Sequence, residues 1–244
     1  LFYSGYGLEM ADLKAFRTWN SLTPGHPEYG HTAGVEMTTG PLGQGVATAV
    51  GMAMAARFER GLFDPETAVG KSLFDHTIWV ICSDGDLEEG VSAEASSLAG
   101  TQELGNLVII YDDNRISIEG DTHNAFTEDV SARYRAYGWQ VIDVPAAADG
   151  RIDLPAVDAA MISAKAELTK PSLIRMHSVI AWPAPKLRGT AKSHGSALGD
   201  EEIAATKKEL GLNPEEKFAM PAEVFAHVRA VKDRGAASHA EWNK

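Results

Sequence analysis

The chain has 244 residues, of which 44 % are hydrophobic and 23 % are charged, so it can bury one large core. Its formal net charge of −12 at pH 7 argues against nucleic acid or an anionic membrane surface as a partner, because both attract clustered Lys and Arg. The single cysteine, Cys82, excludes a disulfide framework and a cysteine-rich zinc site within the chain. The uncharged segment 40–56 contains Pro41, Gln44 and Thr48 and falls short of the roughly 20 apolar residues of a membrane span. We therefore expect no membrane crossing and a reducing, cytoplasmic location.

Short apolar runs alternate along the chain with longer segments of helical period. This alternation is typical of a parallel sheet flanked by helices. In chain order, the pattern predicts helix 41–59, strand 77–83, helix 92–104, strand 107–112, helix 127–137, strand 139–144, helix 154–168, strand 172–177 and helix 200–210. The predicted fold class is α/β, with a mostly parallel sheet between helices on both faces, in three layers.

Local patterns add detail to these elements. Apolar residues recur at every fourth position of the first predicted helix and predict a core-facing side: Val46, Val50, Met54 and Phe58. Gly105 and Gly211 are predicted to end the helices that precede them. Residues 181–200 have little period and several Pro and Gly, which predicts a long loop of the kind that often serves function.

Polar side chains follow two of the predicted strands. In IWVICSDGDLEEG, residues 78–90, a strand ends and four carboxylates follow: Asp84, Asp86, Glu88 and Glu89. Asp112, Asp113 and Asn114 follow the next strand, and ligands gather beyond the carboxyl ends of parallel strands. Oxygen ligands of this kind suit Mg²⁺ or Ca²⁺ rather than Zn²⁺. A lone Ser-Asp-Gly fits an ordinary turn with solvated acids equally well, so this pattern alone leaves both readings open.

Five motifs settle the reading by resemblance. An Asp-Gly pair followed about 30 residues later by Asn is the thiamine diphosphate signature, and Asp84, Gly85 and Asn114 match it. The chain resembles the transketolase family, specifically its first, diphosphate-binding part, over essentially its whole length. The motifs that carry the resemblance, in the family's order, are TPGHPE (23–28), VEMTTGPLGQG (35–45), SDGDLEEGVSAEA (83–95), YDDNRISIEG (111–120) and KSHGSALGD (192–200). The resemblance implies the thiamine diphosphate-binding fold.

By the same resemblance, Asp84, Asn114 and the backbone carbonyl of Ile116 bind the divalent ion. Gly85 and Asn114 let the diphosphate approach closely. The metal, with backbone N–H groups at helix N-termini, supplies the positive charge that this acidic chain lacks. The family usually has Gly-Asp-Gly, whereas Ser83 takes the first position here, with little expected effect because the carboxylate and second glycine remain.

The motif TTGPLGQG is implied to hold the cofactor's organic part. The family uses the backbone of Gly40 and Pro41 against the pyrimidine ring, and Leu42 is expected to pack against the cofactor's rings. The same residues fit the first turn of an ordinary helix.

Three further residues match catalytic positions of the family. His26 is expected to contact substrate hydroxyl groups, and His194 to reach both the diphosphate and the substrate, because imidazole exchanges protons near neutral pH. Glu89 matches a buried glutamate that links the two cofactor sites across a dimer interface. Asp86 and Glu88 are expected to be solvated turn residues.

The resemblance implies transfer of a two-carbon ketol unit between sugar phosphates in the pentose phosphate pathway. The cofactors are thiamine diphosphate with Mg²⁺ or Ca²⁺, and the full-length form is a homodimer. We assign residues 1–200 to the diphosphate-binding domain and 201–244 to a helical extension. That extension leads toward an absent pyrimidine-binding domain, which comes from the same or a partner chain and supplies an activating glutamate. The fragment alone is therefore predicted to be inactive.

Alternatives remain at this point. The chain starts LFYSGYGLEM, without an initiator Met or leader, and stops mid-helix, which favours a truncated single-chain enzyme over one subunit of a split transketolase. Dihydroxyacetone synthase is a related alternative, whereas the GHPE and SHG motifs disfavour deoxyxylulose phosphate synthase. A non-catalytic binding module that kept the fold is the alternative of a different class.

Overall fold

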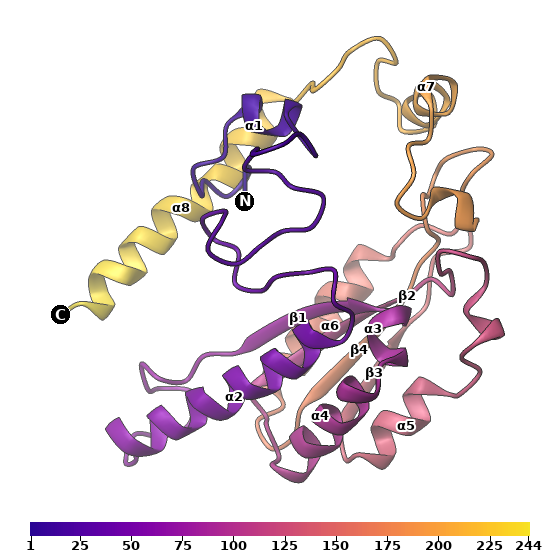
Figure 1. The fold of residues 1–244 in the computed structure, drawn as a ribbon. Coiled ribbons are helices and arrows are strands. Elements are labelled where there is room, and N and C mark those ends of the chain that lie inside the picture. Colours follow the sequence, from indigo (N-terminus) through magenta and orange to yellow (C-terminus); the bar gives the residue numbers. More distant parts are fainter. The chain divides into compact units, whose positions relative to one another are not determined.

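The computed structural model describes residues 1–244, which form two compact units (Figure 1). Unit 1 comprises Leu1–Pro41 and Glu216–Lys244, and unit 2 comprises Leu42–Glu215. The domain division at residue 200 stays a prediction.

Unit 2 is built on a four-stranded sheet in which all strands are parallel and the order is β1-β2-β4-β3. The strands are β1 (Ile78–Ser83), β2 (Leu107–Asp113), β3 (Gln140–Val144) and β4 (Ser172–His177). Each lies within one residue of its predicted bounds. The parallel α/β prediction is therefore confirmed.

All five predicted helices are present, with ends shifted by a few residues. The α-helices of unit 2 are α2 (Gln44–Phe63), α3 (Asp84–Glu88), α4 (Gly90–Thr101), α5 (Val130–Ala136), α6 (Leu154–Ala166) and α7 (Asp200–Glu209). Residues 181–200 carry only the short 3₁₀ helix η2 (Ala191–Ser193), which confirms the predicted loop, and a second one, η1 (Thr122–Asn124), follows β2. The short helix α3 was not predicted, because one turn is too brief to show a helical period.

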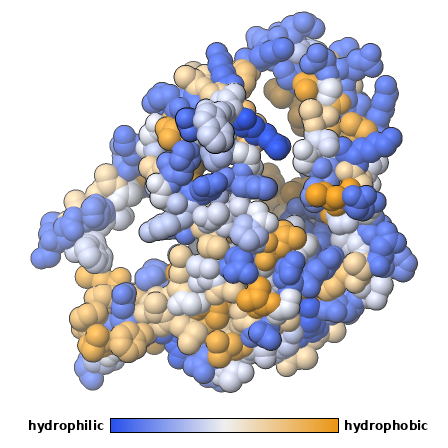
Figure 2. Space-filling model, in the orientation of Figure 1, coloured by the Kyte–Doolittle hydropathy of each residue, from blue (hydrophilic) through white to orange (hydrophobic).

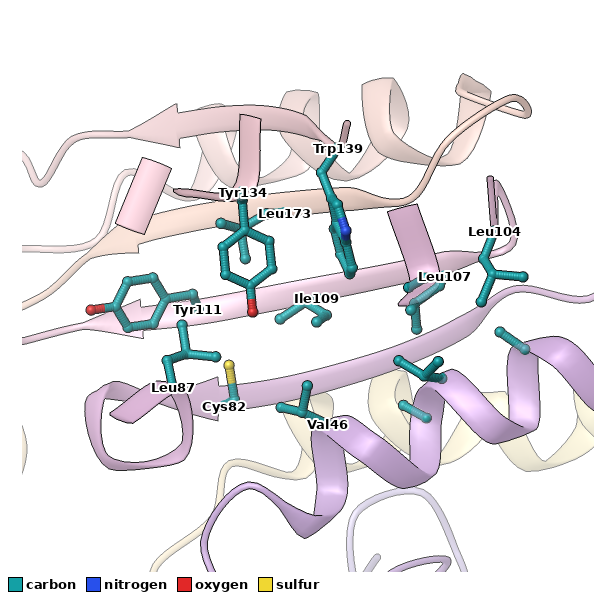
Figure 3. Close-up of a cluster of buried hydrophobic side chains, with 14 of the residues drawn as sticks. Val46, Cys82, Leu87, Leu104, Leu107, Ile109, Tyr111, Tyr134, Trp139 and Leu173 are labelled. Atoms are coloured by element: carbon teal, nitrogen blue, oxygen red, sulfur yellow. The ribbon is translucent and has the colours of Figure 1, made fainter. Parts of the chain in front are cut away.

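Helices cover both faces of the sheet, because side chains alternate across each strand. Leu107, Ile109 and Tyr111 of β2 join a large cluster with residues of α2, α4 and α5 (Figures 1 and 3). Val108, between them in sequence, packs with Ala160 and other residues of α6 on the opposite face. The predicted three-layer arrangement follows from these two clusters.

The predicted core face of α2 is correct only at its start. Val46 and Val50 are buried, but Met54 is 38 % and Phe58 70 % exposed. Steps of four residues advance by slightly more than one turn of 3.6 residues, so the row winds away from the sheet. The alanines at 49, 53 and 56 take its place in the core, and Figure 2 shows hydrophobic surface over the C-terminal half of α2.

The two glycines predicted to end helices behave differently. Gly211 follows α7 with φ +69° and donates to the carbonyl of Lys208, as a helix-ending glycine does. The prediction for Gly105 is wrong, because α4 ends at Thr101 and the positive φ of 51° lies at Glu103. Gly105 instead permits a close approach, since an added Cβ would lie 2.2 Å from the carbonyl oxygen of Leu168.

Unit 1 contains α1 (Met10–Lys14) and α8 (Ala222–Trp242). Arg229 of α8 lies over the ring of Phe225 at 4.6 Å and near the ring of Phe2 at 5.9 Å. None of the side chains of α8 is buried. Across both units, no helix combines the length and apolar character that a bilayer crossing requires.

Candidate functional site

The carboxyl ends of β1 and β2 place the predicted metal ligands side by side. The strands are paired in register up to Ser83 and Asp112, so the residues after each strand emerge at the same edge. Asp84 starts α3 directly after β1 and is only 2 % exposed. Asn114 and Ile116 lie in the turn that follows β2.

The Asp84 carboxylate is buried and held from two sides. Its Oδ1 accepts a hydrogen bond of 2.7 Å from the Tyr111 hydroxyl, and its Oδ2 accepts one of 3.1 Å from the backbone N–H of Arg115. Burial raises the pKa of the Asp84 carboxyl group, and the hydrogen bond from Tyr111 opposes that rise. Burial also raises the pKa of the Tyr111 hydroxyl, which therefore stays protonated and donates.

Asp84 has no cationic partner in the structure, whereas its neighbour Asp113 does. Asp113 is 3 % exposed, and its Oδ2 lies 2.8 Å from Nε and Nη2 of Arg175 and 3.0 Å from Nδ1 of His177. A buried charge requires compensation, and of the two buried carboxylates at this edge only Asp84 lacks a cationic partner. A bound cation would supply it.

Asn114 presents an amide oxygen in the turn after β2. Its Oδ1 accepts a bond of 2.9 Å from the N–H of Ile116, and its Nδ2 donates to Oδ2 of Asp112 at 3.2 Å. These bonds fix the orientation of the amide and leave its oxygen one lone pair. Arg115 takes a positive φ of 60°, which turns the chain and brings its N–H to Asp84.

The backbone carbonyl oxygen of Ile116 is also free to bind a cation. Ile116 pairs with Asp121 in an isolated antiparallel bridge. The flanking hydrogen bonds run from the Ser117 N–H to the carbonyl of Gly120 and from the Thr122 N–H to the carbonyl of Arg115. Neither bond uses the carbonyl oxygen of Ile116.

This donor set fits a hard divalent cation. It combines a carboxylate, an amide oxygen and a backbone carbonyl, which are ligands that Mg²⁺ and Ca²⁺ accept. No cluster of three or more His, Cys, Asp or Glu side chains suited to a metal ion is present, so a ligand set of the zinc type is not formed. A cavity of about 580 Å³ lies beside the site and is lined in part by Asp84, Arg115 and Arg175.

Two of the predicted cofactor residues of unit 2, Leu42 and Gly85, lie next to each other. A Cβ added to Gly85 would lie 3.2 Å from Cδ1 of Leu42, so these two residues are adjacent. The expectation that Asp86 is a solvated turn residue is wrong. Its Oδ1 accepts from the N–H of Gly43 at 2.9 Å and its Oδ2 from the N–H of Ser83 at 3.0 Å, which ties the Gly43 turn to the start of α3.

Unit 1 holds the other part of the predicted set. Gly40 has φ +114°, and a Cβ added to it would lie 3.0 Å from Nδ1 of His26, so the imidazole lies against the Gly40 backbone. His26, Gly40 and Pro41 are all exposed. The structure thus brings His26 to the predicted cofactor loop.

The remaining two predicted catalytic residues are exposed. His194 follows η2, and its imidazole makes no hydrogen bond or ion pair. Glu89 occupies the position before α4, next to the exposed Glu88. The burial of Glu89 by a partner subunit stays a prediction.

Sequence reasoning missed Tyr111 and the N–H of Arg115 as partners of Asp84. Tyr111 belongs to the YDDNRISIEG motif and lies on the same face of β2 as the buried Leu107 and Ile109, which was the available signal. A backbone donor such as the Arg115 N–H leaves no signal in the residue type.

Comparison with known proteins identifies the family of the chain. The family model for the transketolase thiamine diphosphate-binding domain matches residues 1–244. The Mycobacterium leprae transketolase is 54 % identical over 242 residues, which are 99 % of this chain and 34 % of that protein. The Campylobacter jejuni transketolase structure has a TM-score of 0.89 and 44 % identity, and covers 99 % of this chain and 36 % of that one.

A transketolase structure from Pichia stipitis in complex with sedoheptulose 7-phosphate has the same TM-score of 0.89 with 44 % identity. The matched region is 99 % of this chain and 35 % of the Pichia stipitis chain. The chain spans about a third of the length of each of these three proteins. It belongs to the transketolase family, in which it corresponds to the thiamine diphosphate-binding domain.

Proposed function

We propose that this chain is the diphosphate-binding part of a transketolase, which transfers a two-carbon ketol unit from a ketose phosphate to an aldose phosphate. The observation that carries the proposal is Asp84. It is a buried carboxylate without a cationic partner, held against the turn that presents Asn114 and Ile116. A divalent cation at this place would neutralise it and hold a diphosphate.

Different residues would bind the two parts of the cofactor. Asp84, Asn114 and the carbonyl of Ile116 would bind Mg²⁺ or Ca²⁺, and Gly85, which has no side chain, would let the diphosphate approach closely. Gly40, Pro41 and Leu42 would contact the cofactor's organic rings. When bound, thiamine diphosphate supplies the carbon–carbon bond chemistry, and the protein supplies orientation and electrostatics.

His26 and His194 would hold and move protons at substrate hydroxyl groups. Both imidazoles are exposed and make no ion pair in the structure, so they are free to meet a substrate. Glu89 is exposed on this chain, and we expect a partner subunit of a homodimer to cover it. A pyrimidine-binding domain of the same or a partner chain would complete the cofactor site.

Sugar phosphates are the proposed substrates. The Pichia stipitis relative has been captured with sedoheptulose 7-phosphate, a ketose phosphate of the kind that the proposed reaction requires. Ketol transfer is expected from the full-length enzyme and not from residues 1–244 alone.

The test is Asp84→Asn in the full-length enzyme. The change keeps the size of the side chain and removes the charge, so the metal loses its anionic ligand. A ligand at 100 times its dissociation constant stabilises a protein by about 2.7 kcal/mol. We therefore expect Mg²⁺ with thiamine diphosphate to raise the unfolding free energy of the parent enzyme by about that amount and to leave D84N nearly unchanged.

Glu88→Gln is the matched control. It removes one charge from the same acidic run, but Glu88 is exposed and makes no ion pair, so the variant should keep the full ligand-dependent gain. If D84N kept the same gain as E88Q, the metal site would lie elsewhere.

A further inference from the structure

Tyr111 stands between the two buried carboxylates at the edge of the sheet. Its hydroxyl lies 2.7 Å from Oδ1 of Asp84 and 3.4 Å from Oδ1 of Asp113. A phenol has one proton to donate, and the shorter contact is a normal O–H···O hydrogen bond whereas the longer one is not. The Tyr111 hydroxyl therefore donates its hydrogen bond to Asp84.

Asp113 has other partners, because Arg175 and His177 contact its Oδ2 at 2.8 Å and 3.0 Å. The register of the sheet enforces the arrangement, since Tyr111 is paired with Cys82 on one side and with Arg175 on the other.

The ring of Tyr111 is buried in the hydrophobic core. Tyr111 is 2 % exposed and belongs to the same hydrophobic cluster as Leu87 and Ile109. Figure 3 shows its ring at one end of the cluster, beside Leu87, with the hydroxyl pointing out of the cluster. The hydroxyl is thus a fixed donor on a rigid strand.

Together, the two donors restrict Asp84. The Tyr111 hydroxyl takes one lone pair of Oδ1 and the Arg115 N–H takes one of Oδ2, which sets the plane of the carboxylate while leaving lone pairs for a cation. We propose that Tyr111 is a positioning residue for the metal: its hydroxyl orients the Asp84 carboxylate toward the ion before the ion binds. Partners of this kind commonly change metal affinity when they are removed.

This inference rests on the proposed metal site at Asp84. The test uses the full-length enzyme with thiamine diphosphate in excess and measures the dissociation constant of Mn²⁺ by electron paramagnetic resonance. Tyr111→Phe removes only the hydroxyl. We expect it to weaken Mn²⁺ binding by about 10- to 100-fold. Binding should recover at correspondingly higher Mn²⁺ concentration.

Tyr134→Phe is the matched control. Tyr134 is 1 % exposed in the same cluster, and its hydroxyl makes one buried hydrogen bond of 2.9 Å, to Ser96. Each variant removes one buried hydroxyl and its hydrogen bond from this cluster, so Y134F reports the effect on Mn²⁺ binding of a hydroxyl loss that does not touch Asp84. Y134F should bind Mn²⁺ as the parent enzyme does.

Three results would overturn the inference. Equal Mn²⁺ affinity in Y111F and the parent enzyme, with binding lost in D84N, would reject the role of Tyr111 and leave the metal site standing. Equal weakening in Y111F and Y134F would show a general effect of core destabilisation. Unchanged binding in D84N would reject the site itself, and the role of Tyr111 with it.

Discussion

The ion pair between Arg175 and Asp113 should be among the most sensitive polar contacts of unit 2. Arg175→Met keeps much of the aliphatic part of the side chain but leaves the Asp113 carboxylate buried without its main cation. The side chains of Arg175 and Asp113 are 18 % and 2 % exposed. Breaking a buried pair by removing one partner destabilises by about 3–5 kcal/mol.

The remaining contacts of Asp113 set where in this range the loss falls. His177 stays at 3.0 Å and Arg115 at 3.7 Å, and both compensate in part. We therefore expect a loss near the lower end, about 3 kcal/mol, which is a large share of the 5–15 kcal/mol typical of a folded domain. The assay is urea unfolding, with hydrogen exchange of the amides of β2 and β4 to report on unit 2 itself.

Arg135→Met is the matched control. Arg135 pairs with Asp143 at the same 2.8 Å, but the two side chains are 54 % and 39 % exposed, so the loss should be only about 0–1 kcal/mol. The double variant Asp113→Asn with Arg175→Met should recover most of the loss, because it leaves no uncompensated charge. Equal losses in R175M and R135M would refute the argument that burial decides the energy of these pairs.

Two further predictions concern packing and reactivity. Gly105→Ala should lower the free energy of unfolding by about 1–3 kcal/mol, because the new Cβ would lie 2.2 Å from the carbonyl oxygen of Leu168. Gly51→Ala in α2 should raise it by about 0.5–1 kcal/mol, because no atom lies within 4 Å of the new Cβ. Urea midpoints compare the two, and a G105A midpoint at or above that of the parent chain would contradict the clash. Burial, and next the charge of Asp86, raise the pKa of the Cys82 thiol, so a thiol reagent at pH 8 should label it only as the chain unfolds. Rapid labelling of the folded chain, followed by mass spectrometry, would show that β1 opens locally.

The sequence by itself determined the strands and the main helices of unit 2. Runs such as Leu107–Asp113 are short, β-branched and bounded by turn residues, and each strand was located to within one residue. The motifs likewise predicted Asp84, Asn114 and the carbonyl of Ile116 as metal ligands, and the structure places the three residues at the same edge of the sheet. The family followed from the order of five motifs.

Tertiary structure decided what no local pattern encodes. Met54 and Phe58 face outward because the helix winds away from the sheet, and Asp86 binds two backbone N–H groups, one of them on Gly43, far away in sequence. The register of the parallel strands determines that Arg175 forms an ion pair with Asp113 and that Tyr111 donates a hydrogen bond to Asp84. Hydrogen bonds and charge compensation between strands depend on distances across the sheet, which residue types and spacing alone do not specify.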